Sequence, residues 1–226
     1  MIEKHYYQKR FMDWYERNRR DLPWRGSKDP YIIWLSEIIL QQTRVIQGTP
    51  YFHAFFEKFP SLADLASAPE EEILRTWQGL GYYSRARNMH HCARLIVEQY
   101  EGRFPATCEE LMALPGIGPY TAAAIASIAF EQPVPVLDGN VYRVLSRLFG
   151  LSEDITSSRA KHVFRAQAEL IMDHEQPGEF NQAMMEFGAL QCIPKNPECN
   201  TCIFNEHCFA YQNGLVDELP VKKKKK

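Results

Sequence analysis

Two carboxylates in the sequence lie in settings that suit opposite roles in acid–base chemistry. Glu37 lies among the apolar residues of segment 34–40, where partial burial would raise its pKa and let it donate a proton near neutral pH. Asp138 follows the apolar stretch 134–137, and we expect it to cap a helix whose dipole lowers its pKa. One acid and one permanent anion suit cleavage of a glycosidic bond through an oxocarbenium-like transition state. For Glu37 by itself, however, the solvated face of an amphipathic helix is the more common setting.

Four cysteines near the C-terminus have the spacing C-x6-C-x2-C-x5-C and predict a metal centre: Cys192, Cys199, Cys202 and Cys208. The N-terminus has no apolar export signal, so crowded cysteines indicate metal binding rather than disulfides. Zinc ribbons pair two C-x2-C knuckles and only one is present here, whereas an iron–sulfur cubane accepts wider and unequal spacings. The remaining cysteines, Cys92 and Cys108, are expected to be buried helix residues.

The glycines of the segment Leu-Pro-Gly-Ile-Gly at 114–118 predict an anion site between two helices. Gly116 and Gly118 permit backbone conformations closed to other residues and bring main-chain N–H groups to the surface. The helix that follows points its positive end at the same place, which suits a DNA phosphate. A tight corner with glycine as a helix C-cap explains these residues equally well.

The elements that would position these residues are all predicted to be helical, because the apolar residues recur with helical spacing and no segment alternates as a strand does. Tyr7, Phe11 and Trp14 share one face of a first helix. Ser67 with Glu70, and Thr107 with Glu110, have the spacing of capping boxes. Further helices are expected over 31–46, 51–59, from the first capping box to near Gly79, and over 84–100, 108–114 and 120–130, with others beginning near 138, 158 and 178.

Charge and composition do not decide whether the protein binds nucleic acid. The 226 residues have a formal net charge of −2, and the lysine run 222–226 supplies five of the positive charges. A local basic stripe can coexist with an acidic remainder, and the candidate stripe is Arg17, Arg19, Arg20, Arg25 and Lys28. No apolar run is long enough to span a membrane, so we expect no membrane partner and a cytoplasmic location.

Seven motifs together resemble the adenine DNA glycosylases of the MutY type, within the helix-hairpin-helix glycosylase superfamily that includes endonuclease III. They are LPWR at 22–25, WLSEIILQQT at 34–43, GLGYYSRARN at 79–88, LPGIGPYTA at 114–122, LDGNVYRVL at 137–145, FNQAMMEFGA at 180–189 and the four cysteines. The resemblance covers residues 4–220. It implies an all-α, two-lobed fold with a C-terminal [4Fe-4S] cluster loop. Residues 23–132 would form a six-helix barrel module with the hairpin, 1–22 and 133–215 the cluster module, and 216–226 a linker or tail.

The resemblance also implies a role for each candidate residue. Glu37 would protonate adenine N7 and Asp138 would stabilise the sugar cation, with Tyr120 and Asn140 orienting these groups. The other residues would bind DNA or metal: Arg25 and Gln182 in the adenine pocket, Gln42 and Tyr82 as wedges in the base stack, Gln41, Thr43, Gly116 and Gly118 as DNA contacts, and the four cysteines as cluster ligands.

Two departures from the family pattern limit this expectation. Bifunctional relatives have a lysine at the position of Tyr120, because Schiff-base chemistry needs an amine, so strong lyase activity is not expected here. The family usually has a further C-terminal domain that recognises 8-oxoguanine, and this sequence ends near the expected linker. Discrimination of 8-oxoguanine from guanine is therefore left open.

The expected function is excision of adenine opposite 8-oxoguanine or guanine in double-stranded DNA, by a monomer acting on the nucleoid of a bacterial-type cytoplasm. The nearest alternative is a mismatch thymine DNA glycosylase of the same superfamily, although segment 79–83 and the pair Gln41-Gln42 favour adenine. A non-catalytic iron–sulfur DNA-binding protein is the alternative from a different class.

Overall fold

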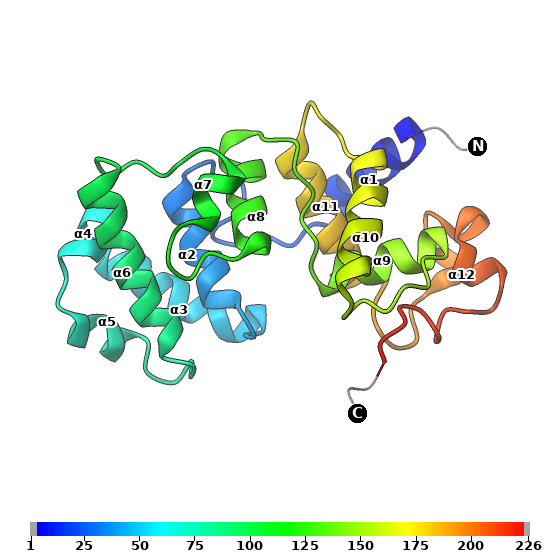
Figure 1. The fold of residues 1–226 in the computed structure, drawn as a ribbon. Helices are drawn as coiled ribbons and strands as arrows, with labels where there is room; N and C mark the ends of the chain where they lie inside the picture. Colours follow the sequence, from blue (N-terminus) through cyan, green and yellow to red (C-terminus); the bar gives the residue numbers. More distant parts are fainter. Residues whose placement is uncertain (1–3, 224–226) are drawn as a thin grey trace. The chain divides into compact units, whose positions relative to one another are not determined.

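The computed structural model describes residues 4–223, and all regular secondary structure in that range is helical (Figure 1). The chain divides into two compact units. Unit 1 combines the chain up to Arg20 with the chain from Pro133 onward, and unit 2 is Asp21–Gln132. The all-α expectation is confirmed; the assignment of residues 23–132, and of 1–22 with 133–215, to functional modules stays a prediction.

Each unit is built from short helices joined by tight connections. Unit 1 holds α1 Lys4–Asn18, α9 Gly139–Phe149, α10 Ser158–Ile171, α11 Pro177–Leu190, the 3-10 turns η1 Cys199–Thr201 and η2 Asn205–His207, and α12 Phe209–Gln212. Unit 2 holds α2 Pro30–Leu40, α3 Val45–Lys58, α4 Leu62–Ser67, α5 Glu70–Thr76, α6 Ser84–Gln99, α7 Cys108–Met112 and α8 Pro119–Phe130. None of the described helices has the length and apolar character that crossing a bilayer requires.

Helix α2 is the central element of unit 2. It begins after Asp29, whose carboxylate accepts a hydrogen bond from the backbone N–H of Tyr31 at 2.8 Å. Trp34 and Ile39 are fully buried, and α2 packs against both α3 and α8. Glu37 is the one charged residue of this helix and is half-buried. The packing of α2 therefore holds a single carboxylate at the boundary of an apolar core.

The core of unit 1 joins the two ends of the chain. The predicted face of α1 is confirmed, since Tyr7, Phe11 and Trp14 are buried. The ring of Phe11 meets that of Phe187 on α11 edge to face, with centroids 5.3 Å apart. Phe204, from the cysteine-bearing segment, is buried in the same cluster. Helix α1 thus helps to anchor the segment that holds the cysteines.

The helix expected over 31–46 is wrong in its C-terminal part. Helix α2 ends at Leu40 because the chain turns at Gln42, whose φ of 56° is left-handed. Helix α3 then begins at Val45, well before the expected 51, and contains Pro50. Pro50 has no N–H to donate to the carbonyl of Ile46, yet α3 continues through it.

One of the two expected capping boxes is also wrong. Ser67 ends α4 and donates its hydroxyl to the carbonyl of Asp64, while the capping box of this region is formed by Ser61 and Asp64. Helix α5 begins after Pro69 without a side-chain cap. The negative charges of the three glutamates in its first turn interact favourably with the positive end of the helix dipole. At the second site Thr107 does cap α7, accepting from the N–H of Glu110 at 3.2 Å.

Residues 216–223, expected to be a linker or tail, pack against unit 1. Leu219 is buried, and its carbonyl accepts a hydrogen bond from Nε of Arg147 at 3.0 Å. The N–H of Ile155 donates to the carbonyl of Val221 at 3.0 Å. The lysine run 222–226 lies partly outside the described residues.

Candidate functional site

Asp138 caps α9, as expected. Its Oδ1 accepts from the N–H of Val141 at 2.7 Å, and its Oδ2 accepts from Nδ2 of Asn140 at 2.7 Å. Asn140 therefore contacts Asp138 directly, and its predicted role in orienting the catalytic groups stays a prediction. The carboxylate thus lies at the N-terminus of α9, and each of its two oxygens accepts a hydrogen bond.

The expected direction of the Asp138 pKa is wrong. Burial of the carboxyl raises its pKa, and this effect outweighs the hydrogen bonds from Val141 and Asn140 and the charge of Arg143, all of which lower it. Capping was visible in the sequence, whereas the depth of burial depends on tertiary packing. An anion in such a site has lost much of its hydration, so it attracts a developing positive charge more strongly than an exposed carboxylate does.

Arg143 is a site residue that sequence reasoning missed. Its Nη2 donates to Oδ1 of Asn140 at 2.8 Å and to the carbonyl of Gly188 at 2.6 Å, while its Nε donates to the carbonyl of Cys192 at 2.7 Å. A Cβ at Gly188 would lie 2.6 Å from the Cβ of Asn140, so only glycine lets α11 approach α9 this closely. The sequence feature that could have revealed Arg143 is its place inside the apolar run Val-Tyr-Arg-Val-Leu. A guanidinium buried among such residues needs several hydrogen-bond acceptors.

Glu37 and Tyr120 belong to the other unit. Glu37 lies on α2 and Tyr120 is the second residue of α8, which packs against α2, and both side chains are half-buried. Arg25 is half-buried in the turn that precedes α2. Unit 2 thus carries the predicted acid, and unit 1 carries the predicted anion.

The hairpin between α7 and α8 is formed as expected, but glycine occupies its two positions for different structural reasons. Gly116 has a φ of 77°, and a Cβ there would lie 2.9 Å from the Cβ of Asn88, so backbone and space both require glycine. Gly118 is the N-cap of α8 with φ −88° and open space around it. The prediction that Gly118 needs a conformation closed to other residues is wrong; its missing side chain leaves the positive end of α8 accessible.

The predicted wedge residues occupy two exposed turns of unit 2. Gln42 and Tyr82 are both left-handed, with φ 56° and 47°, and Tyr82 is 66% exposed. Gln41 directs its amide towards Oγ1 of Thr121 at 3.5 Å, and Thr43 donates to the carbonyl of Gln41 at 3.3 Å. The DNA contacts of Gln41 and Thr43 stay predictions.

Gln182 is held by α1. The hydroxyl of the buried Tyr15 donates to Oε1 of Gln182 at 3.1 Å, which orients the amide of this half-buried residue. The adjacent Asn181 accepts from the N–H of Val136 at 3.0 Å and donates to the carbonyl of Val134 at 2.9 Å. Asn181, which sequence reasoning missed, thereby fixes the segment that leads into Asp138.

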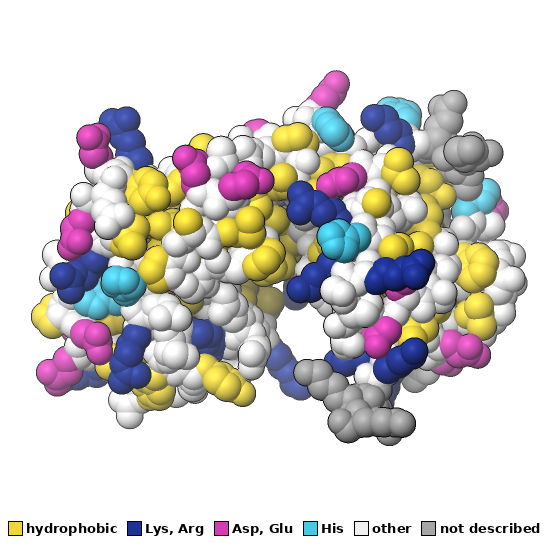
Figure 2. Space-filling model, in the orientation of Figure 1, with side chains coloured by type: hydrophobic (Ala, Val, Ile, Leu, Met, Phe, Trp, Pro, Cys, Tyr) yellow, Lys and Arg dark blue, Asp and Glu magenta, His cyan; other side chains and the backbone are white. Residues whose placement is uncertain are grey.

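The expected basic stripe is partly neutralised within each unit. Arg20 forms an ion pair with the buried Glu186 at 2.6 Å, and Lys28 forms one with Glu131. On the face seen in Figure 2, basic and acidic side chains are interspersed on both units. The face seen there is therefore not dominated by positive charge.

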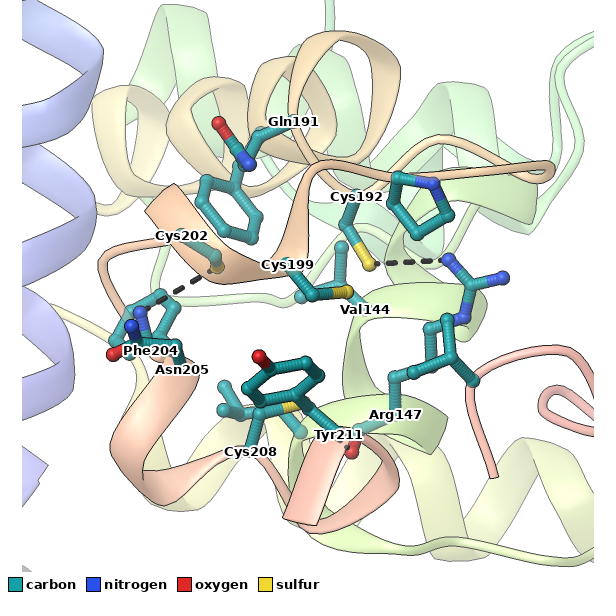
Figure 3. Close-up of a pocket in the computed structure, with 14 residues that line it drawn as sticks. Val144, Arg147, Gln191, Cys192, Cys199, Cys202, Phe204, Asn205, Cys208 and Tyr211 are labelled. Carbon is teal, nitrogen blue, oxygen red and sulfur yellow. Dashed lines mark hydrogen bonds between the residues drawn. The ribbon is translucent and has the colours of Figure 1, made fainter. Parts of the chain in front are cut away.

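The four predicted cysteine ligands, Cys192, Cys199, Cys202 and Cys208, line one pocket in unit 1 that opens to solvent. Figure 3 shows the cysteines around a common space, with Arg147 at its side. Nη1 of Arg147 donates to Sγ of Cys192 at 3.6 Å, and the N–H of Phe204 donates to Sγ of Cys202 at 3.5 Å. Within residues 4–223, no three His, Cys, Asp or Glu side chains are placed to hold a single metal ion.

The surroundings of the cysteines fit a positively charged metal group. Burial raises the pKa of Cys202 to about 12, and it also raises the pKa of Cys199 and Cys208. Thiolates in this pocket therefore need a cationic partner. Four soft sulfur donors around a common space suit a soft metal centre, either a single ion or an iron–sulfur cluster.

Comparison with known proteins identifies the family. Residues 35–170 match the family described as "HhH-GPD superfamily base excision DNA repair protein". The chain belongs to the HhH-GPD superfamily. The matched range includes the hairpin, the part of α2 that carries Glu37 and the helix capped by Asp138.

Relatives of this HhH-GPD chain bear out the resemblance seen in its motifs. It is 44% identical to the adenine DNA glycosylase of Rattus norvegicus, over 95% of this chain and 44% of the relative. It is 41% identical to the adenine DNA glycosylase of Buchnera aphidicola subsp. Schizaphis graminum, over 95% of this chain and 62% of the relative. The chain spans about half the length of the curated relatives it matches.

A solved structure confirms the expected glycosylase fold. A thermostable thymine-DNA glycosylase superposes with a TM-score of 0.85 at 28% identity, over 93% of this HhH-GPD chain and 97% of the other. The similarity of the two folds covers nearly all of both chains. Fold alone therefore does not decide which base is removed.

Proposed function

We propose that this chain is an adenine DNA glycosylase, which hydrolyses the N-glycosidic bond of adenine mispaired with 8-oxoguanine or guanine. The observation that carries the proposal is the geometry of Asp138, a half-buried carboxylate with donors on both oxygens at the start of a helix. The identity of 44% with an adenine DNA glycosylase supports adenine as the base. Base excision of this kind requires one acid and one anion.

The proposed chemistry divides the work between the two carboxyl groups. Glu37 donates a proton to N7 of adenine, so that the bond between C1′ and N9 breaks with its electron pair moving to the base. The Asp138 carboxylate stabilises the resulting positive charge on the sugar, and water adds to C1′ and loses a proton, which returns Glu37 to its acid form. Tyr120 and Asn140 orient these groups, and Arg25 and Gln182 line the pocket for the flipped base.

The proposed partner is double-stranded DNA that contains the mispair. The open N-terminus of α8 beside Gly118 offers backbone N–H groups to a phosphate, which fixes the register on the duplex without reading sequence. Gln42 and Tyr82 enter the stack beside the partner base. Action as a monomer, in the cytoplasm and on nucleoid DNA, stays a prediction.

Tyr120 supports hydrolysis without strong strand cleavage. A lyase step needs an amine that forms an imine with the sugar aldehyde, and a phenol cannot form one. We therefore propose a monofunctional enzyme, or one with only weak lyase activity.

The pH profile gives a test of Asp138 and its neighbour. Excision needs the charged carboxylate, so activity falls as the pH drops through the pKa that Asp138 has in the folded protein. Asn140→Ala removes a donor that lowers this pKa, so the acid limb of the single-turnover profile should move to higher pH. The variant keeps the Cβ that contacts Gly188. An unchanged or lower acid limb would contradict the role of Asn140.

We also propose that Cys192, Cys199, Cys202 and Cys208 hold a [4Fe-4S] cluster. Such a cluster would cross-link the segment from Cys192 to Cys208 and hold it against α9 and α11. Its support is the shared pocket, the all-sulfur donor set and the N–H groups directed at Cys192 and Cys202.

Metal analysis tests the cluster directly. The purified chain should contain about four iron atoms and absorb near roughly 400 nm, as thiolate–iron charge transfer does. Cys202→Ala should lose both iron and colour. Cys92→Ala, which removes a thiol buried in α6 of the other unit, is the matched control and should keep both. A colourless chain with one zinc would refute the cluster.

A thymine glycosylase is the second candidate, because the fold superposes closely on one. Single-turnover assays on matched duplexes, one with adenine opposite 8-oxoguanine and one with thymine opposite guanine, separate the two. We expect adenine to be released faster. Faster release of thymine would replace adenine in the proposal.

A further inference from the structure

The guanidinium of Arg85 lies between two turns of unit 2 and is surrounded by backbone carbonyls. Its Nη1 and Nη2 donate to five main-chain oxygens, those of Ile38 at 3.2 Å, Ile39 at 3.3 Å, Gln41, Leu80 at 3.2 Å and Gly81 at 3.4 Å. We call residues 41–44 the Gln42 loop and residues 77–83 the Tyr82 loop. One side chain from α6 therefore binds the backbone of both.

On the side of the Gln42 loop, Arg85 satisfies the end of α2. The last carbonyls of a helix have no partners within it, and a cation there is favoured by the helix dipole. Helix α2 has no basic residue in its own last turn. Arg85 supplies the missing cation from elsewhere in the sequence, at the point where the chain turns into Gln42.

On the side of the Tyr82 loop, the same guanidinium is held by aromatic rings. It lies 4.9 Å from the ring centroid of Trp77 and 5.8 Å from that of Tyr82. Nε1 of Trp77 donates to the carbonyl of Gly81 at 2.9 Å, which fixes the same stretch of backbone. Arg85 thus contacts the loop backbone and the Tyr82 ring at once.

Each loop presents one exposed side chain on a left-handed backbone. Gln42 has φ 56° and Tyr82 has φ 47°, a left-handed conformation that is sterically unfavourable for a non-glycine residue. Tyr82 is also 66% exposed, so burial of its ring does not offset that cost. Strained and exposed residues that the core does not need are typical of functional positions.

We propose that Arg85 is a positioning residue that holds the two loops as one rigid unit, so that Gln42 and Tyr82 enter the DNA stack together. This inference rests on the proposed function. Arginine suits the role because its planar fork reaches both sets of carbonyls, whereas lysine keeps the charge but concentrates it at one point. Arg85 itself need not touch DNA.

A double-mutant cycle tests the proposal. Arg85→Lys, Tyr82→Ala and the double variant are compared by single-turnover excision of adenine opposite 8-oxoguanine, and by fluorescence of a 2-aminopurine placed beside the target base, which reports unstacking. We expect Arg85→Lys alone to lower excision about tenfold and to weaken the fluorescence change. In the Tyr82→Ala background, Arg85→Lys should lower the excision rate by less than about a further twofold, because the effects of residues that act through one another are not additive.

The controls separate positioning from folding. Arg87→Lys, on the same helix with an exposed ion pair to Glu70, should excise at the unsubstituted rate. A lower unfolding temperature for Arg85→Lys with unchanged fluorescence, or additive losses in the cycle, would overturn the role of Arg85. No excision by the unsubstituted chain would instead reject the proposed function and this inference with it.

A second cycle compares Gln42→Ala, Tyr82→Ala and their double variant, first with Arg85 in place and then in the Arg85→Lys background. If the two loops act as one unit, the losses in excision should be non-additive with Arg85 in place. They should become additive in the Arg85→Lys background. If Arg85→Lys does not fold, the measurements with Arg85 in place still test the proposal, since additive losses there contradict the coupling between the two loops.

Discussion

Glu37→Gln lowers the single-turnover rate of adenine excision by at least about 10²-fold, the loss typical of removing a general acid. Glutamine has nearly the same shape but cannot donate a proton to the leaving base. Because Glu37 is the one charged residue of α2 and its neighbours on that helix are buried, the substitution should leave the packing of unit 2 intact. Binding to the mispaired duplex, measured at fixed salt, should be largely kept.

The matched control for this substitution is Glu57→Gln, an exposed residue of α3 in the same unit. It should excise adenine at the unsubstituted rate. Unchanged excision by Glu37→Gln would remove Glu37 from the mechanism, and a loss explained entirely by weaker duplex binding would show that Glu37 acts in binding rather than as the acid.

Asp138→Asn lowers excision by about 10²–10³-fold, the range seen when one electrostatic stabiliser of a transition state is removed. The amide has no negative charge to set against the sugar cation. Asparagine caps helices about as well as aspartate, so α9 should still begin at Gly139. Thermal unfolding monitored by circular dichroism checks that the variant is folded.

Asp173→Asn provides the comparison for this residue. Asp173 also accepts hydrogen bonds from backbone N–H groups, those of Glu175 and Gln176, but these bonds are more exposed than those of Asp138. The same change there should leave excision unaltered. Full activity of Asp138→Asn would mean that the negative charge is not needed, and the division of labour between Glu37 and Asp138 would be wrong.

The sequence predicted best what depends on local spacing. The face of α1, the cap at Asp138 and the start of α8 are set by residues within a few positions of one another. The break after α2 was missed because the apolar pattern continues through Val45 and Ile46, while the turn is set by the left-handed backbone of Gln42. The helix start expected at 51 was also wrong, since α3 begins at Val45 and continues through Pro50.

The site residues that sequence reasoning missed act over long sequence separations. Arg143 reaches Cys192 and Arg85 reaches Ile38 through side chains whose partners lie more than forty positions away. No periodicity or motif spacing reports such contacts. The same holds for the pKa of Asp138, since the cap that lowers it is local and the burial that raises it is not.

The central claim is most directly tested by identifying the base that this chain releases. A duplex with adenine opposite 8-oxoguanine is incubated with excess protein, the free base is identified by chromatography, and the strand is examined before and after alkali. We predict release of free adenine, with a strand that stays largely intact until alkali is added. Release of no base, or strand cleavage in step with base release before alkali, would contradict the account.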